Sequence, residues 1–417
     1  MDGTPEQVPE LAGGRVLVGR VSASVLDQGL STATNLLITL VAAGVLGIRG
    51  FGTFGVAYLV AVAVVGSVRA AIGSPALVLQ DAAARDDASA PFGAALSTGL
   101  VTGGLVALAA VGTGPSLRGP LLALAVVLPG ILIQDTGRLV EFAALRPGRA
   151  LVLDVIWAVA LVVGLVVVGS QTRLTATSLL LIWGGSGTLS ALWTLWKHGR
   201  RLPRPSIHWL RECWEYAWRY LVVFASTLGV FQVTTLILGG ISGVAAVGAV
   251  RATQVLFGPI QNLATGLMVA LVPETSMDTP LRAQRNRLFV VSTMLTLVAL
   301  VITGVGLLLP DSLGEAVLGK SWSSAHDLLV PAGLGAAMFG VASGPVIGLR
   351  AARAVPGSLV VGLQISAFQF VIPVAGALIG DESGYMWALV LTWILGTALW
   401  WRCYFAIERD WPVASAA

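Results

Sequence analysis

The sequence predicts an all-α polytopic membrane protein with about twelve transmembrane helices. Apolar residues make up 56% of the 417 positions and charged residues only 11%, whereas about a quarter of the residues in a soluble domain are charged. Apolar runs of about 20 residues, the length of helix that crosses a bilayer, recur along the whole chain. The 50 glycines are typical of helices that pack closely inside a membrane.

Six of these runs lie in each half of the chain. Proline occurs inside the fourth, eighth and tenth runs, where neighbouring helices satisfy the freed backbone groups. The predicted spans are residues 23–46, 54–76, 93–112, 119–141, 149–169 and 175–197 in the first half, and 219–239, 244–272, 287–309, 326–348, 357–379 and 384–406 in the second.

The basic residues predict the orientation of these spans. Of the 25 lysines and arginines, 18 fall on one side of the predicted membrane, four fall on the other, and Arg69, Arg138 and Arg251 lie within spans. Because basic loops stay in the cytoplasm, both termini are expected there. Cys213 and Cys403 then lie at the reducing face and are expected to be free thiols.

The two halves are expected to form pseudo-symmetric six-helix lobes around a central cavity, as in transporters built from parallel repeats. Gly47, Gly50 and Gly55 recur 193 residues later as Gly240, Gly243 and Gly248, although chance could give this spacing in a glycine-rich chain. The predicted lobes are residues 1–204 and 205–417. Within the second, residues 205–218 form an aromatic connecting segment, which is expected at the membrane interface because Trp and Tyr favour that level.

Charged side chains inside the spans are candidates for a functional site, because a charge is costly within a bilayer. The first span carries a polar stripe at helical spacing, and the fourth carries a second; Arg69 and Asp154 lie in the second and fifth spans. A structural alternative is that Asp27 pairs with Arg69, and Asp135 with Arg138, to tie helices together. The two stripes are Ser24, Asp27, Gln28, Ser31 and Asn35, and Gln134, Asp135, Arg138 and Glu141.

Arg251 differs from the other charged residues because its predicted span contains no acidic residue. A buried cation without a partner favours an anion as its ligand, and the transported substrate could supply one. The sequence therefore predicts Arg251 as the leading substrate-binding residue.

One short stretch, Gly314–Ser321 (GEAVLGKS), matches the phosphate-loop pattern G-x-x-x-x-G-K-[ST]. It falls between the ninth and tenth spans on the outer side, where there is no ATP, so we expect an interfacial turn there and no nucleotide. No catalytic or metal-binding spacing is present, and no loop is long enough for a catalytic domain. We therefore expect a protein that is not an enzyme, has no cofactor or metal, and binds no nucleic acid.

Three stretches resemble bacterial polysaccharide and O-antigen flippases, a Wzx-like family of the multidrug/oligosaccharidyl-lipid/polysaccharide exporter (MOP) superfamily. They are residues 25–58 (VLDQGLSTATNLLITLVAAGVLGIRGFGTFGVAY), 133–157 (IQDTGRLVEFAALRPGRALVLDVIW) and 318–329 (LGKSWSSAHDLL). Family features in them include the acidic residue before a Leu-Gly and Phe-Gly turn, and the order Gln-Asp, Arg, Asp, Trp. Gln28 follows Asp27, where flippases of lipid II commonly carry a basic residue, which argues against lipid II as the substrate.

The resemblance implies a V-shaped pair of lobes that moves a polyprenyl-pyrophosphate-linked oligosaccharide across the bacterial cytoplasmic membrane by alternating access. It implies substrate-binding roles for Arg251, Arg138 and Arg69. Gln254, in the same span as Arg251, is a further substrate-binding candidate, and Asp27, Asp135 and Asp154 are candidates for coupling or ion pairs. Expected partners are this glycolipid, membrane lipids, and a glycan polymerase or glycosyltransferases.

Two other functions stay open from the sequence. A cation-coupled multidrug exporter of the related branch would carry acidic residues deep in the first lobe and few cavity arginines, so Arg138 and Arg251 count against it. A non-transporting scaffold of a glycan-assembly complex is the other. A major-facilitator transporter is disfavoured, because its basic loop after the second span is replaced here by LQDAAARDDASAP.

Overall fold

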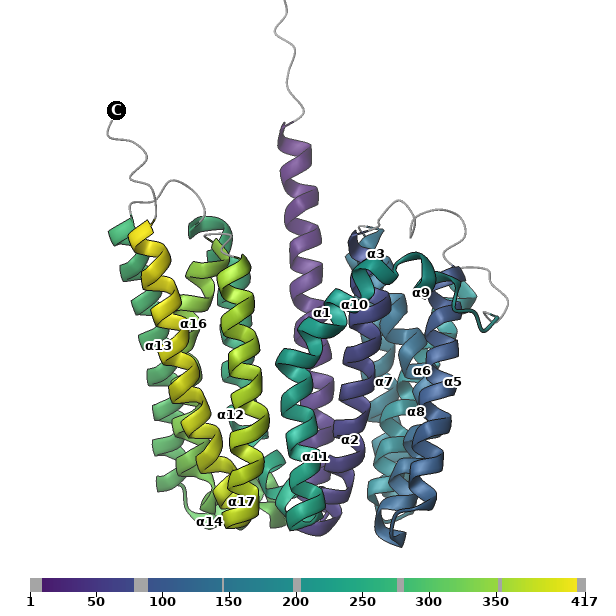
Figure 1. The fold of residues 1–417 in the computed structure, drawn as a ribbon. Helices are drawn as coiled ribbons and strands as arrows, with labels where there is room; N and C mark the ends of the chain where they lie inside the picture. The colour runs from purple at the N-terminus through teal and green to yellow at the C-terminus, as the bar shows by residue number, and fades with distance from the viewer. Residues whose placement is uncertain are drawn as a thin grey trace, which may run out of the picture. The chain divides into compact units, whose positions relative to one another are not determined.

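The computed structural model describes residues 10–78, 89–144, 146–197, 204–275, 281–351 and 355–410, and these residues form helices joined by short turns, without a strand among them (Figure 1). Several residues behind the predicted orientation, such as Arg85, Arg200 and Arg353, lie outside the described residues. The helices are α1 (Glu10–Val45), α2 (Ile48–Val68), η1 (Arg69–Gly73), α3 (Ser74–Val78), α5 (Ser89–Val111), α6 (Pro115–Ala143), α7 (Pro147–Gln171), α8 (Ala176–Lys197), α9 (His208–Glu212), α10 (Trp214–Phe224), η2 (Ala225–Gly229), α11 (Val230–Ser242), α12 (Val244–Thr275), α13 (Leu281–Leu308), α14 (Asp311–Leu318), η3 (Gly319–Ser321), α15 (Trp322–Asp327), α16 (Leu329–Ala351) and α17 (Val355–Asp410).

Each of the twelve predicted spans falls on helix. In the described part of the chain, nine helices are long and apolar enough to cross a membrane. One of them, α17, provides two spans, because the chain breaks at Gly380 and Asp381, where Asp381 has a φ of 51°. The remaining two spans correspond to α12 and to the run α10–η2–α11. The prediction of an all-α polytopic membrane protein is confirmed.

The chain packs as two compact units, which are described separately. Unit 1 comprises Met1–Ile38 and Ala61–Phe224, and unit 2 comprises Thr39–Val60 and Ala225–Ala417. Helices α1 and α2 therefore contribute to both. The predicted lobes 1–204 and 205–417 stay a prediction, and residues 205–218 pack with unit 1.

The fourth long helix of each half is the central one of its unit. In unit 1, α6 packs against α5, α7 and α8, and in unit 2, α16 packs against α12, α13 and α17. Small residues allow these contacts: a Cβ on Gly99 of α5 would lie 2.6 Å from Pro129 Cα of α6, and a Cβ on Gly344 of α16 would lie 2.7 Å from the Leu288 carbonyl oxygen of α13. Close backbone approach through glycine is how membrane helices associate.

Unit 2 also contains a reciprocal contact between the starts of α2 and α12. A Cβ on Gly52 would collide with the carbonyl oxygen of Val244, the first residue of α12, and a Cβ on Gly248 would lie 2.7 Å from the carbonyl oxygen of Ile48, the first residue of α2. Ile48 and Val244 are 196 residues apart. The contact thus pairs Gly52 with Gly248, which are also 196 residues apart, and the repeat with an offset of 193 stays a prediction.

Candidate functional site

The most charged part of the buried interior lies in unit 1, where α1, α6 and α7 meet. Asp27 of α1 is fully buried, Asp135 and Arg138 of α6 are 4% and 7% exposed, and Asp154 of α7 is 2% exposed. Gln28, which neighbours Asp27, is exposed. The three- and four-residue spacing on α1 and α6 places these groups on helix faces that point into the unit.

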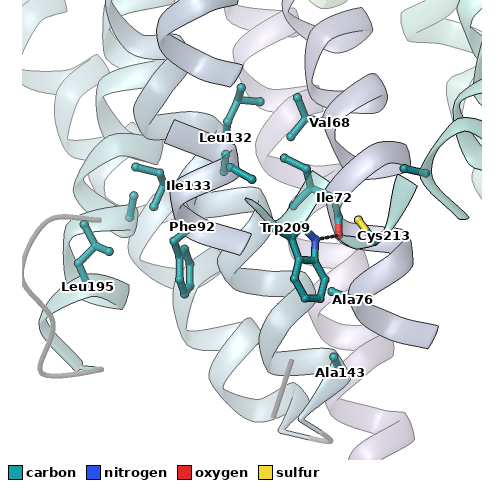
Figure 2. Packing of buried hydrophobic residues seen from close by; sticks show 14 residues of the cluster. Val68, Ile72, Ala76, Phe92, Leu132, Ile133, Ala143, Leu195, Trp209 and Cys213 are labelled. Atoms are coloured by element: carbon teal, nitrogen blue, oxygen red, sulfur yellow. Dashed lines mark hydrogen bonds between the residues drawn. The ribbon is translucent and has the colours of Figure 1, made fainter. Parts of the chain in front are cut away.

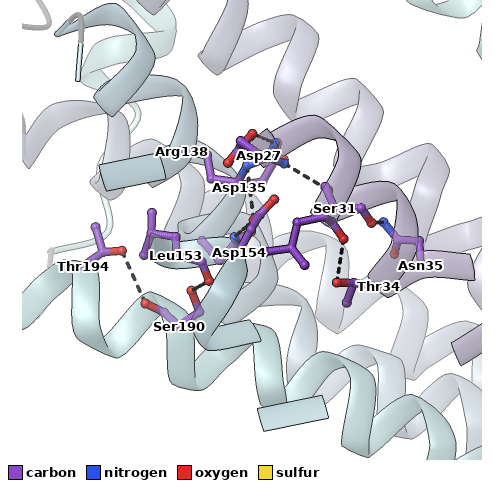
Figure 3. Close-up of polar contacts among 12 residues, drawn as sticks. Asp27, Ser31, Thr34, Asn35, Asp135, Arg138, Leu153, Asp154, Ser190 and Thr194 are labelled. Atoms are coloured by element: carbon purple, nitrogen blue, oxygen red, sulfur yellow. Dashed lines mark hydrogen bonds and ion pairs between the residues drawn. The ribbon is translucent and has the colours of Figure 1, made fainter. Parts of the chain in front are cut away.

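Arg138 is the centre of this cluster. Its guanidinium forms ion pairs with Asp27 and with Asp154, the latter at 3.3 Å between Nε and Oδ1, and lies 4.0 Å from Asp135 Oδ1 (Figure 3). Its Nη1 also donates to Ser31 Oγ at 3.4 Å. One cation thus lies among carboxylates of α1, α6 and α7.

Arg69 extends the cluster. Its Nε donates to Asp135 Oδ2 at 3.1 Å and its Nη2 to Oδ1, which gives a two-pronged ion pair. About half of the Arg69 side chain, 48%, is exposed, whereas Asp135 is buried. The predicted pairing of Asp27 with Arg69 is wrong: Asp27 pairs with Arg138, and Arg69 takes Asp135 as its partner.

Three carboxylates face two guanidinium groups, so the cluster has a formal charge of −1 when all five groups are ionised. Two carboxylate oxygens, Asp27 Oδ1 and Asp154 Oδ2, are buried and accept no hydrogen bond within the described part of the chain. The amide of Gln134 donates to Asp154 Oδ1 at 3.1 Å. A buried carboxylate oxygen without a donor is costly, so the cluster favours an additional proton, cation or water beside these oxygens.

A small cavity lies beside Asp154. It is lined by Ser31, Thr34, Asn35, Asp154 and Trp157 and measures about 10 Å³, about the space that one water molecule needs. Hydrogen bonds from two indoles hold the lining residues Trp157 and Asn35 in place: Trp157 Nε1 donates to the Trp183 carbonyl at 2.9 Å, and Trp183 Nε1 donates to Asn35 Oδ1 at 3.2 Å. The arrangement suits a small polar guest at a carboxylate, and the cavity is too small for an organic substrate.

Arg251 of unit 2 has a different environment. Its Nη1 donates to Gln254 Oε1 at 2.7 Å, and its guanidinium carbon lies 5.0 Å from the centre of the Tyr58 ring. Among the described residues no carboxylate lies within ion-pair distance of it. Its Nε and the Nε2 of Gln254 are buried and form no hydrogen bond there. Arg251 and Gln254 are thus in contact, Arg251 keeps an unused donor at Nε, and the substrate-binding role of both residues stays a prediction.

Known proteins with this arrangement of helices are found among solved structures. An inward-facing multidrug resistance MATE transporter of the MOP superfamily matches 94% of this chain and 100% of its own, with 12% identity and a TM-score of 0.69. The lipid II flippase MurJ in an inward closed conformation matches 93% of this chain and 90% of its own, with 13% identity and a TM-score of 0.64. The chain has the MOP-transporter fold.

A third solved structure has a similar fold. A MOP superfamily transporter from Pyrococcus furiosus, whose binding pocket of reversed polarity suggests a different function, matches 94% of this chain and 96% of its own, with 13% identity and a TM-score of 0.55. No protein-family model and no curated protein sequence matches the chain. The structural similarity shows the fold of these transporters and does not show the substrate of this chain.

The phosphate-loop pattern does not form a phosphate loop in this MOP fold. Its residues run from α14 through η3, and the described residues directly before them, 281–313, form helices and no strand. Ser321, which would bind magnesium in such a loop, is fully buried, and its hydroxyl lies 3.5 Å from the carbonyl oxygen of Ala43. Gly319 has a φ of 56°, which ends α14, and Trp322 donates to Asp311 Oδ1 at 3.0 Å. The segment is a packed helical turn.

Each candidate site contains one residue that no pattern in the sequence indicates. Tyr58 beneath Arg251 lies one helical turn after Gly55 on α2, and no pattern in the sequence indicates that α2 and α12 meet there. Ser190 of α8, which donates to the Leu153 carbonyl at 2.7 Å beside Asp154, is one of many serines in the spans. The positions of Tyr58 and Ser190 at these sites depend on tertiary packing, and no sequence motif marks either residue.

Proposed function

We propose that the protein is a flippase that moves a polyprenyl-pyrophosphate-linked oligosaccharide from the cytoplasmic to the outer leaflet of a bacterial cytoplasmic membrane by alternating access, with both termini in the cytoplasm. The observation that carries the proposal is Arg251, a cation in a membrane helix without a carboxylate partner in the described residues. An uncompensated charge in a span is costly, and an anionic substrate group would compensate it.

The donors around Arg251 suit a pyrophosphate. Arg251 Nε and Gln254 Nε2 are buried without partners, and both can donate to phosphate oxygens. Arginine binds phosphate well because its planar donors match the oxygens and its charge is permanent. The Tyr58 ring supports the guanidinium from one face and leaves its donors free. The same group would repel the cationic compounds that many multidrug exporters carry.

The membrane potential supplies energy for this direction of transport. One charge that crosses about 100 mV gains about 2.3 kcal/mol. A pyrophosphate with about two negative charges that leaves a negative-inside cell is therefore favoured by roughly 4–5 kcal/mol. ATP is not required, which agrees with the helical form of the phosphate-loop pattern. In this proposal Arg69 and Arg138 serve the ion-pair cluster, and Asp27, Asp135 and Asp154 are the sites where a proton or cation could couple to transport.

A cation-coupled multidrug exporter is the second candidate. The specific observation in its favour is the cluster of unit 1, in which three buried carboxylates outnumber two arginines. The MATE transporter with the same fold is a multidrug resistance transporter. Arg251 is the feature that this candidate leaves without a role.

Deletion of the gene separates the two candidates. The flippase proposal expects lipid-linked oligosaccharide to accumulate on the cytoplasmic side, measured by extraction and mass spectrometry of prenyl-linked lipids, with no change in sensitivity to cationic dyes. Dye hypersensitivity with normal lipid-linked oligosaccharide would establish the exporter. A glycan polymerase or glycosyltransferase as partner would be recovered by cross-linking in the wild-type strain.

A further inference from the structure

The segment that connects the two halves of the chain contacts an irregular helical turn that directly follows α2. This turn, η1, is a π-helix of five residues that begins with Arg69 and ends with Gly73. Both α9 and α10 of the connecting segment pack on it. A π-helical turn inside an α-helix is rare and is found mostly at functional sites, so the contacts that stabilise it need an explanation.

Two side chains of the connecting segment donate to carbonyls of this turn. Trp209 Nε1 donates to the Ile72 oxygen at 3.2 Å, and Cys213 Sγ donates to the Ala71 oxygen at 3.7 Å. Trp209 and Cys213 are four residues apart, so they lie on one face of a helical turn. Both are buried, with exposures of 2% and 0%, and they pack with Ile72 in the same apolar cluster (Figure 2).

The π-helical turn determines where Arg69 points. An α-helix turns by about 100° per residue. If η1 changed from the π form to the α form, the helix before η1 would rotate relative to the helix after it by about that angle. Arg69, the first residue of the turn, would then leave Asp135 of α6, with which it forms its two-pronged ion pair. Asp135 in turn lies beside Arg138, the centre of the buried cluster.

We infer that Trp209 and Cys213 are positioning residues for the Arg69–Asp135 ion pair. The connecting segment holds η1 in its π form through these two hydrogen bonds, and η1 directs Arg69 onto Asp135. The segment between the halves is thereby coupled to the charged cluster of unit 1. This coupling does not depend on which substrate the protein carries.

A double-mutant cycle on the full-length protein in detergent tests the inference. The variants are Trp209→Phe, which keeps an aromatic ring and removes the donor, Asp135→Asn, which weakens the ion pair from another helix, and the combination. The midpoint of heat denaturation is measured for each. The matched control is Trp401→Phe, because Trp401 also donates its indole N–H to a helix carbonyl, that of Val341 at 3.1 Å, in unit 2.

We expect Trp209→Phe to lower the midpoint in the wild-type background and to lower it by less than half as much in the Asp135→Asn background, because residues that act through one network are not additive. Trp401→Phe should give the same shift in both backgrounds. Equal Trp209→Phe shifts in the two backgrounds would show that Trp209 only packs, and would overturn the inference.

A second variant keeps the test decisive if Trp209→Phe does not fold. Cys213→Ala removes the other donor with a smaller change in volume, and the same cycle with Asp135→Asn applies to it. Hydrogen exchange gives an independent readout: the peptide that covers residues 69–78 should exchange faster in Cys213→Ala, and the peptide 284–308 of α13, in unit 2, should not change. Unchanged exchange in the first peptide, or an additive cycle, would overturn the inference.

Discussion

Gly52 and Gly248 face each other where α2 and α12 begin: a Cβ on Gly248 would lie 3.1 Å from the backbone nitrogen of Gly52. Each glycine also faces the first residue of the opposite helix, Val244 and Ile48 respectively. The contact is therefore the same when the two helices are exchanged. This reciprocal contact agrees with a repeat of the two halves, which stays a prediction.

Side chains at these glycines should destabilise the protein. We expect Gly52→Ala and Gly248→Ala to lower stability by about 1–3 kcal/mol or more, because an added methyl group overpacks a backbone contact. Gly240→Ala is the matched control, since Gly240 also lies in a helix of unit 2 and a Cβ there meets no atom within 4 Å. The measurement is the yield and the heat-denaturation midpoint of the purified protein. A Gly248→Ala protein as stable as Gly240→Ala would contradict the close contact.

Removal of the Arg138 side-chain charge should be among the most destabilising single changes in unit 1. Arg138→Leu leaves Asp27 and Asp154 buried without their shared cation, and breaking a buried ion pair costs about 3–5 kcal/mol. Arg149→Leu is the control, because Arg149 is 42% exposed and lies 3.9 Å from Glu141. Heat denaturation of the purified variants measures the difference. The triple variant Asp27→Asn, Asp154→Asn, Arg138→Leu should recover stability relative to Arg138→Leu alone, and a further loss would contradict the ion-pair account.

The helices were predictable from the sequence because they depend on local composition. Runs of about 20 apolar residues must form helices in a bilayer, since only a helix satisfies its own backbone there. The spacing of Asp135 and Arg138, three residues apart, likewise placed both on one face of α6. The connection at Gly243, where φ is 86°, was located within a few residues.

The partners of the charged residues were not predictable in the same way. Asp27 could have paired with Arg69 or Arg138, and the choice depends on how α1, α2 and α6 pack. Arg69, which pairs with Asp135, begins the π-helical turn Arg69–Gly73, and nothing in the sequence RAAIG distinguishes a π turn from an α turn. The register of the predicted repeat has a related difficulty, because in a glycine-rich chain the spacing of glycines alone does not show which of them correspond.

Cys213 should resist alkylation in the folded protein. Burial raises the pKa of its thiol from an ordinary value of 9.0 to about 11, and the thiolate is the reactive form. A protein that carries Cys403→Ser, with Cys213 as its single thiol, should therefore not react with N-ethylmaleimide between pH 7 and 9 and should react fully after denaturation in detergent. Intact-mass spectrometry measures the adduct. Rapid labelling of the native protein at pH 8 would contradict the burial of Cys213.

The same shift predicts the sign of a pH effect on stability. A thiol whose pKa is higher in the folded state favours folding while it is protonated in both states, so its contribution is fully present below about pH 9 and is lost as the pH rises toward 11. Cys213→Ala should therefore lose less stability than the Cys213 protein between pH 9 and 11. The heat-denaturation midpoint as a function of pH measures this, with Cys403→Ser in both proteins.

Transport should depend on both the charge and the hydrogen-bond donors of Arg251. We expect Arg251→Ala to abolish complementation of the deletion strain and Arg251→Lys to restore it only in part, because lysine keeps the charge and lacks the planar donors. Arg118→Ala is the control, since Arg118 is exposed and donates only to backbone carbonyls, those of Val111 and Thr113. Each variant is quantified in the membrane by immunoblot, so that a loss of export is separated from a loss of protein.

Binding gives a measurement of Arg251 that does not depend on transport. Farnesyl pyrophosphate, a short prenyl pyrophosphate, should raise the heat-denaturation midpoint of the purified protein, and farnesol should not. Hydrogen bonds from a charged donor contribute about 1.5–3 kcal/mol, so Arg251→Ala should weaken the apparent affinity for farnesyl pyrophosphate by about ten-fold or more. Arg118→Ala should bind as the wild type does. Equal stabilisation of Arg251→Ala and the wild type would show that the unpaired cation of α12 does not bind the pyrophosphate, and the assignment of this residue would fail.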